Sequence, residues 1–138
     1  MNTHYVTTVF KGGMAFDATL NNHLVKLDSV PADGGTDGGA SPKRLMLAAL
    51  AGCTGMDIVP ILNKMKVAFS DFSIAIEARL TAKHPKTYNW VKITYTIKLA
   101  TTSRHNMEKA VNLSQDKYCG VSAMFKEFAA LETEIVYL

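Results

Sequence analysis

The sequence predicts one α+β domain that covers the whole chain, residues 1–138. Three observations predict this class: β-rich segments at the start, one long apolar helix in the middle, and two strongly alternating strands after it. The expected order is β-β-β-α-β-β-α-β, which groups strands and helices instead of alternating them singly, as α+β folds do. A chain of this length can bury a full core without disulfides or metals.

The first thirty residues predict an antiparallel meander of three strands. The β-rich segments are 5–10, 14–20 and 23–30. The turn sequences Lys11-Gly12-Gly13 and Asn21-Asn22 separate them. Residues 31–40 then hold four glycines and two aspartates, which predicts a flexible loop, placed where a lid over a site would lie.

A long helix is expected next, because Ser41 is a favourable N-cap and Pro42 suits the first helical position. The run Leu45–Ala51 is apolar on every side, which is typical of a helix in the core. Pro60 should kink this helix or start a second segment, 61–66. The apolar run is far shorter than the ~20 residues that cross a bilayer, so no membrane contact is expected.

The second half predicts two strands, two helices and a closing strand. In order, they are strands 72–80 and 90–99, helices 104–116 and 119–126, and strand 132–138. Apolar and polar residues alternate in both long strands, so each should have one packed and one wet face. Ser103 stands where it can cap the first of the two helices.

Composition and charge exclude several classes of function. The net charge is +3 and basic residues form no run, so nucleic-acid binding is not expected. The N-terminus has no basic leader followed by an apolar block, and we expect a soluble, cytoplasmic protein. The four scattered histidines do not suggest ligands, so we expect no metal and no cofactor.

Two cysteines, Cys53 and Cys119, are the clearest candidates for chemistry. Two are too few for a disulfide scaffold or a cysteine-only zinc site. In a reducing compartment they would be free thiols. From the residues alone, a buried and inert thiol is the more common state of each.

The two thiols have different predicted surroundings. Cys53 lies in the apolar helix, where apolar neighbours and the Asp57 carboxylate disfavour a thiolate, so activation needs a cation from elsewhere. Gly52 and Gly55 flank it and cost about 1 kcal/mol each relative to alanine, so another element or a substrate should pass close by. Cys119 is expected at a helix start, where free N–H groups lower the pKa of a thiol.

The segment from Ser41 to Asp57, SPKRLMLAALAGCTGMD, resembles the core helix of the OsmC/Ohr family. In that family a proline-containing loop leads into a Leu/Ala-rich helix with a cysteine, and a second cysteine starts a later helix. Here Tyr118-Cys-Gly-Val-Ser122 fills the second place, with Gly120 where proline is usual. The order of strands and helices matches over essentially the whole chain.

The resemblance implies an OsmC-like fold, with an antiparallel sheet wrapped around central helices in an intertwined homodimer, and an active site at the subunit interface. It implies thiol-dependent reduction of organic hydroperoxides in oxidative-stress defence. Cys53 would attack the peroxide oxygen, Cys119 would close a disulfide on it, and an external dithiol reductant would restore both.

This sequence departs from the family pattern at two positions. Peroxidatic members carry a glutamate where Lys43 stands, and an arginine near the first β-turn, which here reads Lys11-Gly12-Gly13. We expect Lys43 or Arg44 to supply the positive charge instead, and a lysine would do so only as a point charge. These departures place the chain nearer a divergent OsmC-like branch.

Asp57 and Met56 complete the expected site. Asp57 would accept a hydrogen bond from a neighbouring helix or loop, or it would tune Cys53 or hold a basic residue in the pocket. Met56 would fill the core or offer an apolar surface to an alkyl substrate. The same alternatives hold for Met46, Met65, Met124 and Phe125. The alternative function is a non-catalytic dimer that binds a small apolar ligand, and a third is a purely structural dimer.

Overall fold

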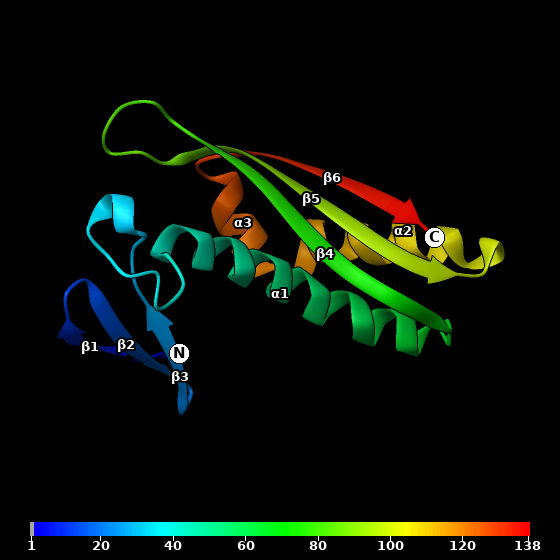
Figure 1. Cartoon of the computed structure of the whole chain (residues 1–138). Helices are drawn as coiled ribbons and strands as arrows, with labels where there is room; N and C mark the ends of the chain where they lie inside the picture. The colour runs from blue at the N-terminus through cyan, green and yellow to red at the C-terminus, as the bar shows by residue number, and fades with distance from the viewer. Residues whose placement is uncertain (1) are drawn as a thin grey trace. The chain divides into compact units, whose positions relative to one another are not determined.

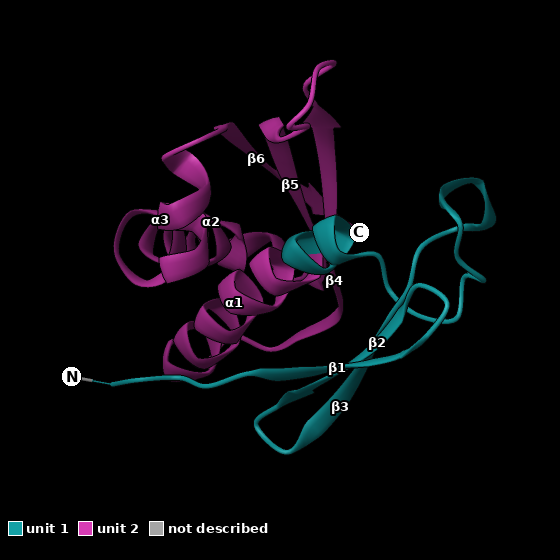
Figure 2. Cartoon of the chain, turned by 90° about the vertical axis from the view of Figure 1, so that its left-hand side faces the viewer, with its two compact units in different colours: residues 1–47 teal, residues 48–138 magenta. Residues whose placement is uncertain are grey.

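A computed structural model describes residues 2–138. The chain divides into two compact units, residues 1–47 and 48–138, with the boundary inside the long helix (Figure 2). The expected element order is confirmed, and each unit is built around its own three-stranded sheet. Whether the chain acts as one domain, as expected, stays a prediction.

The first unit contains the antiparallel meander that the sequence predicts. Its strands are β1 (Thr7–Gly12), β2 (Ala15–Leu20) and β3 (His23–Leu27), paired in that order. Asn21 and Asn22 both have positive φ in the β2–β3 turn, a conformation that asparagine tolerates better than most residues. The third strand ends at Leu27, earlier than expected, because the chain turns there into a hydrogen-bonded loop.

The Asp28 carboxylate organises the glycine-rich loop, which was expected to be merely flexible. Its oxygens accept hydrogen bonds from Ser29 N at 2.7 Å, Thr36 Oγ1 at 3.0 Å and Gly38 N at 3.0 Å. The Gly38 and Ser29 N–H groups lower the pKa of Asp28. A Cβ at Gly39 would lie 2.5 Å from the Lys26 carbonyl oxygen, so this loop position needs glycine.

The central helix, α1 (Pro42–Lys64), runs through Pro60 without ending. The expectation of a second segment from 61 was therefore wrong. Proline removes one backbone N–H and so leaves the carbonyl of Met56 without its helical partner. Both residues are exposed, so water can satisfy that carbonyl.

The second unit continues with strands and helices near their expected places. They are β4 (Phe69–Leu80), β5 (Tyr88–Leu99), η2 (Thr101–Ser103), α2 (Arg104–Leu113), η3 (Ser114–Tyr118), α3 (Gly120–Lys126) and β6 (Ala130–Tyr137). The expected break after α2 is a turn of π-helix, η3. Ser103 precedes α2, but its side chain makes no capping hydrogen bond.

The second sheet has the order β4-β5-β6, and α1, α2 and α3 cover one of its faces (Figures 1 and 2). β4 pairs with β5 antiparallel, whereas β5 pairs with β6 parallel. The sheet that was expected to be antiparallel therefore has one parallel pair in this unit. The connection through α2 and α3 is long enough to carry the chain back to the same end of the sheet, which a parallel pair requires.

The core of this unit lies between β5 and the helices, and the alternation predicted for β5 is confirmed. Its fully buried apolar side chains are Leu50, Ile58, Leu62, Val91, Ile93, Tyr95, Ile97, Met107 and Ala110. Phe125 is buried as expected, but Met46, Met56 and Met124 are exposed. Those three methionines do not fill the core of a single chain.

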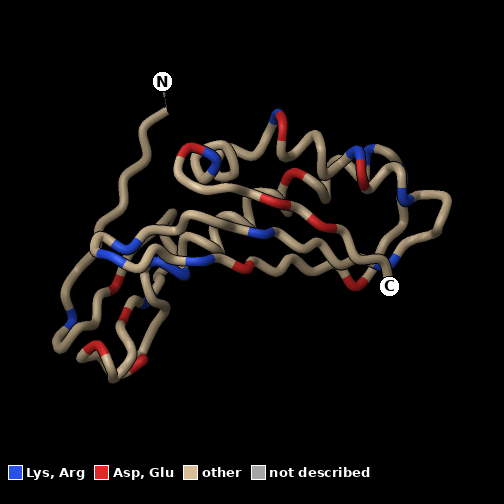
Figure 3. Tube along the Cα trace, turned by 90° about the horizontal axis from the view of Figure 1, so that it is seen from above, with Lys and Arg blue, Asp and Glu red and all other residues tan. Residues whose placement is uncertain are grey.

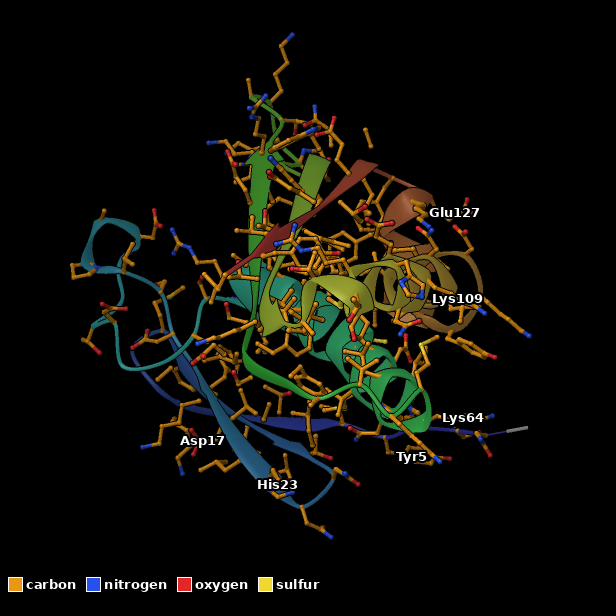
Figure 4. All side chains as sticks on the ribbon, turned by 90° about the vertical axis from the view of Figure 1, so that its right-hand side faces the viewer. Tyr5, Asp17, His23, Lys64, Lys109 and Glu127 are labelled. Atoms are coloured by element: carbon orange, nitrogen blue, oxygen red, sulfur yellow. The ribbon has the colours of Figure 1, made fainter. Side chains whose placement is uncertain are left out.

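Charged groups of both signs are interspersed along the chain (Figure 3). Lys64, Lys109 and Glu127 lie at the surface of the second unit (Figure 4). The helix α1 is long and apolar enough to cross a membrane, judged by length and composition alone. Core helices of soluble proteins pass the same test. In α1, 22% of the most apolar stretch is buried.

Candidate active site

The two cysteines meet inside the second unit. Cys53 is half-buried in the middle of α1, and Cys119 is the N-cap residue of α3. The two side chains lie close enough for Cys53 to influence the pKa of Cys119. Folding therefore brings together two thiols that are far apart in the sequence, and both are free in this structure.

Cys119 is held by the first turn of α3. Its sulfur accepts hydrogen bonds from Ser122 N at 3.3 Å and Ser122 Oγ at 3.0 Å. Its own backbone N–H bonds to the Ser114 carbonyl oxygen at 2.7 Å. The expected position of Cys119 at a helix start is confirmed, because its side chain is the N-cap that accepts the Ser122 N–H.

Burial raises the pKa of Cys119, and so does its contact with Cys53, although both hydrogen bonds from Ser122 lower it. The expectation that the helix start would leave this thiol with a lowered pKa was wrong. Only 3% of Cys119 is exposed, and removing a thiolate from water outweighs two hydrogen bonds to it. Within residues 2–138, no cation is among the influences on this pKa.

A buried network of hydroxyl groups lies behind the thiols. Thr54, next to Cys53 on α1, lies 2.7 Å from the Tyr95 hydroxyl and 2.7 Å from Ser114 Oγ. Ser114 Oγ donates to Asp57 Oδ2 at 2.9 Å. Thr54, Tyr95 and Ser114 are fully buried, so these bonds satisfy groups that water cannot reach.

Gln115 joins this network to Cys119. Its Nε2 lies 3.2 Å from the Tyr95 hydroxyl and 3.0 Å from Ser122 Oγ, with a longer contact of 3.5 Å to Thr54. The backbone carbonyl of Gln115 accepts a bond from Lys126 Nζ at 2.8 Å. Gln115 belongs to the π-helical turn η3, and single π-helical turns occur often at functional sites.

The other expected site residues lie in different places. Asp57 accepts a hydrogen bond from the segment after α2, which is the structural role expected for it. Met56 is 78% exposed and lines a groove of about 570 Å³ between α1 and β4. Lys43 and Arg44 are exposed in the first turn of α1 and belong to the first unit, so their part in the site stays a prediction.

The two glycines beside Cys53 have different surroundings. A Cβ at Gly55 would lie 3.0 Å from Ile74 Cδ1, so β4 passes close to the helix there, as expected. At Gly52 no atom lies within 4 Å of such a Cβ among the described residues. The open side of the helix at Gly52 is therefore free for a partner or a substrate.

Five residues of the network were not singled out from the sequence as site residues: Thr54, Tyr95, Ser114, Gln115 and Ser122. Two signals could have indicated them. Ser114 follows Met107 and Val111 at helical spacing, so it continues the buried face of α2 at the start of η3. Ser122 stands three residues after Cys119, where its backbone N–H can bond to an N-cap side chain. No group of three or more His, Cys, Asp or Glu side chains converges anywhere between residues 2 and 138.

An α+β fold with two interacting thiols at its core helix defines the class of protein. The sequence profile of the OsmC family, described as OsmC-like protein, matches residues 35–134. The chain therefore belongs to the OsmC-like family. Membership of this family supports a redox or stress-related role.

Known proteins show the same fold. A hypothetical protein from Aquifex aeolicus VF5 superposes with a TM-score of 0.86 at 26% identity, covering 100% of this chain and 98% of that one. Protein YhfA from Escherichia coli K12 is 26% identical over 91 residues, which is 66% of this chain and 68% of YhfA. An organic hydroperoxide resistance protein OsmC from Legionella pneumophila has a TM-score of 0.70 at 18% identity, covering 99% and 98%.

Proposed function

We propose that this protein is a thiol-dependent reductase of organic hydroperoxides, serving oxidative-stress defence in the cytoplasm through Cys53 and Cys119. The observation that carries the proposal is that folding brings these two free thiols close enough to interact. A sulfenic acid formed on one of two thiols this close can be captured by the other before it is oxidised further. The organic hydroperoxide resistance protein from Legionella shares the fold, which is consistent with this chemistry.

The reaction balances with an external dithiol as reductant. The Cys53 thiolate attacks the outer peroxide oxygen, the O–O bond breaks, and the alkoxide takes up a proton and leaves as an alcohol. Cys53 is then a sulfenic acid. Cys119 attacks its sulfur, so that a disulfide forms and water leaves. The dithiol reduces this disulfide by two exchange steps and becomes a disulfide itself.

The environment of Cys119 supports its role as the resolving thiol. Burial raises the pKa of Cys119, and so does the neighbouring Cys53, so Cys119 keeps its proton near neutral pH. Cys53 is also the less buried of the two. The attacking role therefore falls to Cys53. Lys43 or Arg44 remains our proposed source of positive charge for it.

Peroxide consumption by the purified protein tests this function. With cumene hydroperoxide and dithiothreitol, the wild-type protein should consume peroxide catalytically. With one equivalent of peroxide and no dithiol, it should form a disulfide that links the peptides of Cys53 and Cys119, read by non-reducing peptide mass spectrometry. Two unmodified thiols after this treatment, together with no consumption, would overturn the proposal.

A second copy of the chain is the partner that we propose for the exposed side of α1. Only 22% of the apolar stretch of this helix is buried. The groove beside it is lined almost wholly by apolar side chains of α1 and β4, and includes Gly52 and Met56. A helix face that packs on its own copy gives a closed twofold dimer. In such a dimer Met56 would also offer the alkyl part of the substrate an apolar surface.

Light scattering during size-exclusion chromatography tests the dimer. The wild type should elute with twice the chain mass, and Met56→Glu should shift it toward monomer by about tenfold or more in Kd, because a charge would be buried at the interface. Met124→Glu is the matched control, since Met124 is 60% exposed but lies on α3, away from the groove. A monomeric wild type would rule this partner out.

A further inference from the structure

The hydrogen bonds of the buried network have a single possible direction. Ser114 donates its only hydroxyl hydrogen to the Asp57 carboxylate, so it must accept from Thr54. Thr54 has then used its hydrogen and accepts from Tyr95. Tyr95, having donated to Thr54, accepts from Gln115 Nε2. Each hydroxyl can donate only once, so the carboxylate orders this whole branch.

A second branch leaves Gln115 in the other direction. The remaining Nε2 hydrogen points to Ser122 Oγ, and Ser122 donates its own hydrogen to Cys119 Sγ. Ser122 N also donates to that sulfur. The sulfur therefore accepts two bonds from α3, and its own S–H is free to point at Cys53. The direction agrees with the raised pKa of Cys119, since a bond donated by the neutral thiol raises it.

The side-chain amide of Gln115 makes hydrogen bonds through its N–H groups, whereas its oxygen makes none among the described residues. Oε1 is buried and has no hydrogen-bond partner among the described residues. A buried acceptor without a partner is unfavourable, so this orientation is maintained by the two branches that both need an N–H. Gln115 thereby connects the carboxylate at one end with the thiols at the other.

We propose that Gln115 and Ser122 are positioning residues, which hold Cys119 as a hydrogen-bond donor to the Cys53 sulfur and so stabilise a thiolate there. The inference rests on the proposed function, because a Cys53 thiolate serves the reaction proposed above. The hydrogen bond itself can be tested without that reaction. The donated S–H would stabilise the Cys53 thiolate in place of a cation. Among the described residues, no cation influences the pKa of Cys119. The chain of donors ends on the reacting sulfur, and neither positioning residue needs to touch the peroxide.

The titratable and charged groups around this chain of donors come from three elements. They are Asp57 and Cys53 on α1, Tyr95 on β5, Cys119 at the start of α3, and Lys126 on α3 beside the Gln115 carbonyl. Burial raises the pKa of Tyr95, so it stays a neutral donor near neutral pH. The Cys53 charge is therefore the one that the labelling experiment below reads.

Labelling of Cys53 by iodoacetamide, followed at its own peptide by mass spectrometry across pH, tests the inference without any peroxide. Ser122→Ala should slow this labelling at pH 7 by about threefold to tenfold and move its pH profile to higher pH. Ser114→Ala is the matched control: it is another fully buried serine hydroxyl of the same network, but on the Asp57 branch. Its labelling should stay within about twofold of wild type.

Two variants of Cys119 test directly whether its side chain acts as a hydrogen-bond donor to Cys53. Cys119→Ala removes the donor and should slow Cys53 labelling by roughly tenfold, whereas Cys119→Ser keeps a donor and should restore most of the rate. Ser122→Thr, which keeps the hydroxyl, should likewise recover labelling. Equal rates in the alanine variants of Ser122 and Ser114, or wild-type labelling of Cys53 in Cys119→Ala, would overturn the inference. Wild-type protein that shows this labelling pattern but consumes no hydroperoxide would instead reject the proposed function alone.

Discussion

Cys53→Ser is expected to lower hydroperoxide turnover by about a thousandfold or more, to the rate without protein, because a serine hydroxyl is a very weak nucleophile at neutral pH. Cys119→Ser should have a different effect. It keeps the attacking thiol and loses the resolving one, so Cys53 should oxidise once and then go on to the sulfinic acid in excess peroxide. Intact-protein mass spectrometry separates the two: no oxygen is added at position 53 in Cys53→Ser, and two oxygens are added to Cys53 in Cys119→Ser.

The rate at which Cys119 forms the disulfide with oxidised Cys53 is expected to depend on pH. The raised pKa of Cys119 leaves little thiolate near neutral pH, and the thiolate is the attacking form. Disulfide formation after one equivalent of peroxide should therefore speed up about tenfold per pH unit until the pKa of Cys119 is passed. Quenched-flow samples blocked with an alkylating agent would measure this rate. A rate that falls with rising pH, or turnover that survives in Cys53→Ser, would reject the assignment of roles.

Local patterns were sufficient to predict most of the fold. Alternation in β5 identified the central buried strand, and the Asn21-Asn22 dipeptide identified the tight β2–β3 turn. Patterns failed where a distant partner decided the outcome. The parallel pairing of β6 depends on where α2 and α3 return the chain. Likewise, α1 continues through Pro60, where both Pro60 and Met56 are exposed.

Only part of the candidate site could be predicted from the sequence. Cys53 and Cys119 were expected to meet, from the family resemblance, and their side chains do interact. The direction of the Cys119 pKa was not predictable, because a helix start lowers it while burial raises it, and burial depends on the whole core. Gln115 and Thr54 were missed because polar residues in helices usually face solvent.

Thr54→Val is expected to destabilise the protein by about 2–4 kcal/mol, a large effect for a change that keeps the shape of the side chain. Thr54 is fully buried and links the Tyr95 and Ser114 hydroxyls at 2.7 Å each. Valine would leave the hydrogen of Tyr95 without an acceptor and remove the donor to Ser114. Unfolding in urea, followed at fixed protein concentration because a dimer would shift the midpoint, gives the free energy.

Thr94→Val is the control, because Thr94 lies on β5 beside Tyr95 but on the other, half-buried face of the sheet. Valine suits a strand, so this change should stay within about 0.5 kcal/mol. The double variant Thr54→Val with Tyr95→Phe should be less destabilised than the sum of its singles, since phenylalanine removes the hydroxyl that valine leaves unpaired. Strict additivity would mean that the two hydroxyls act independently of each other.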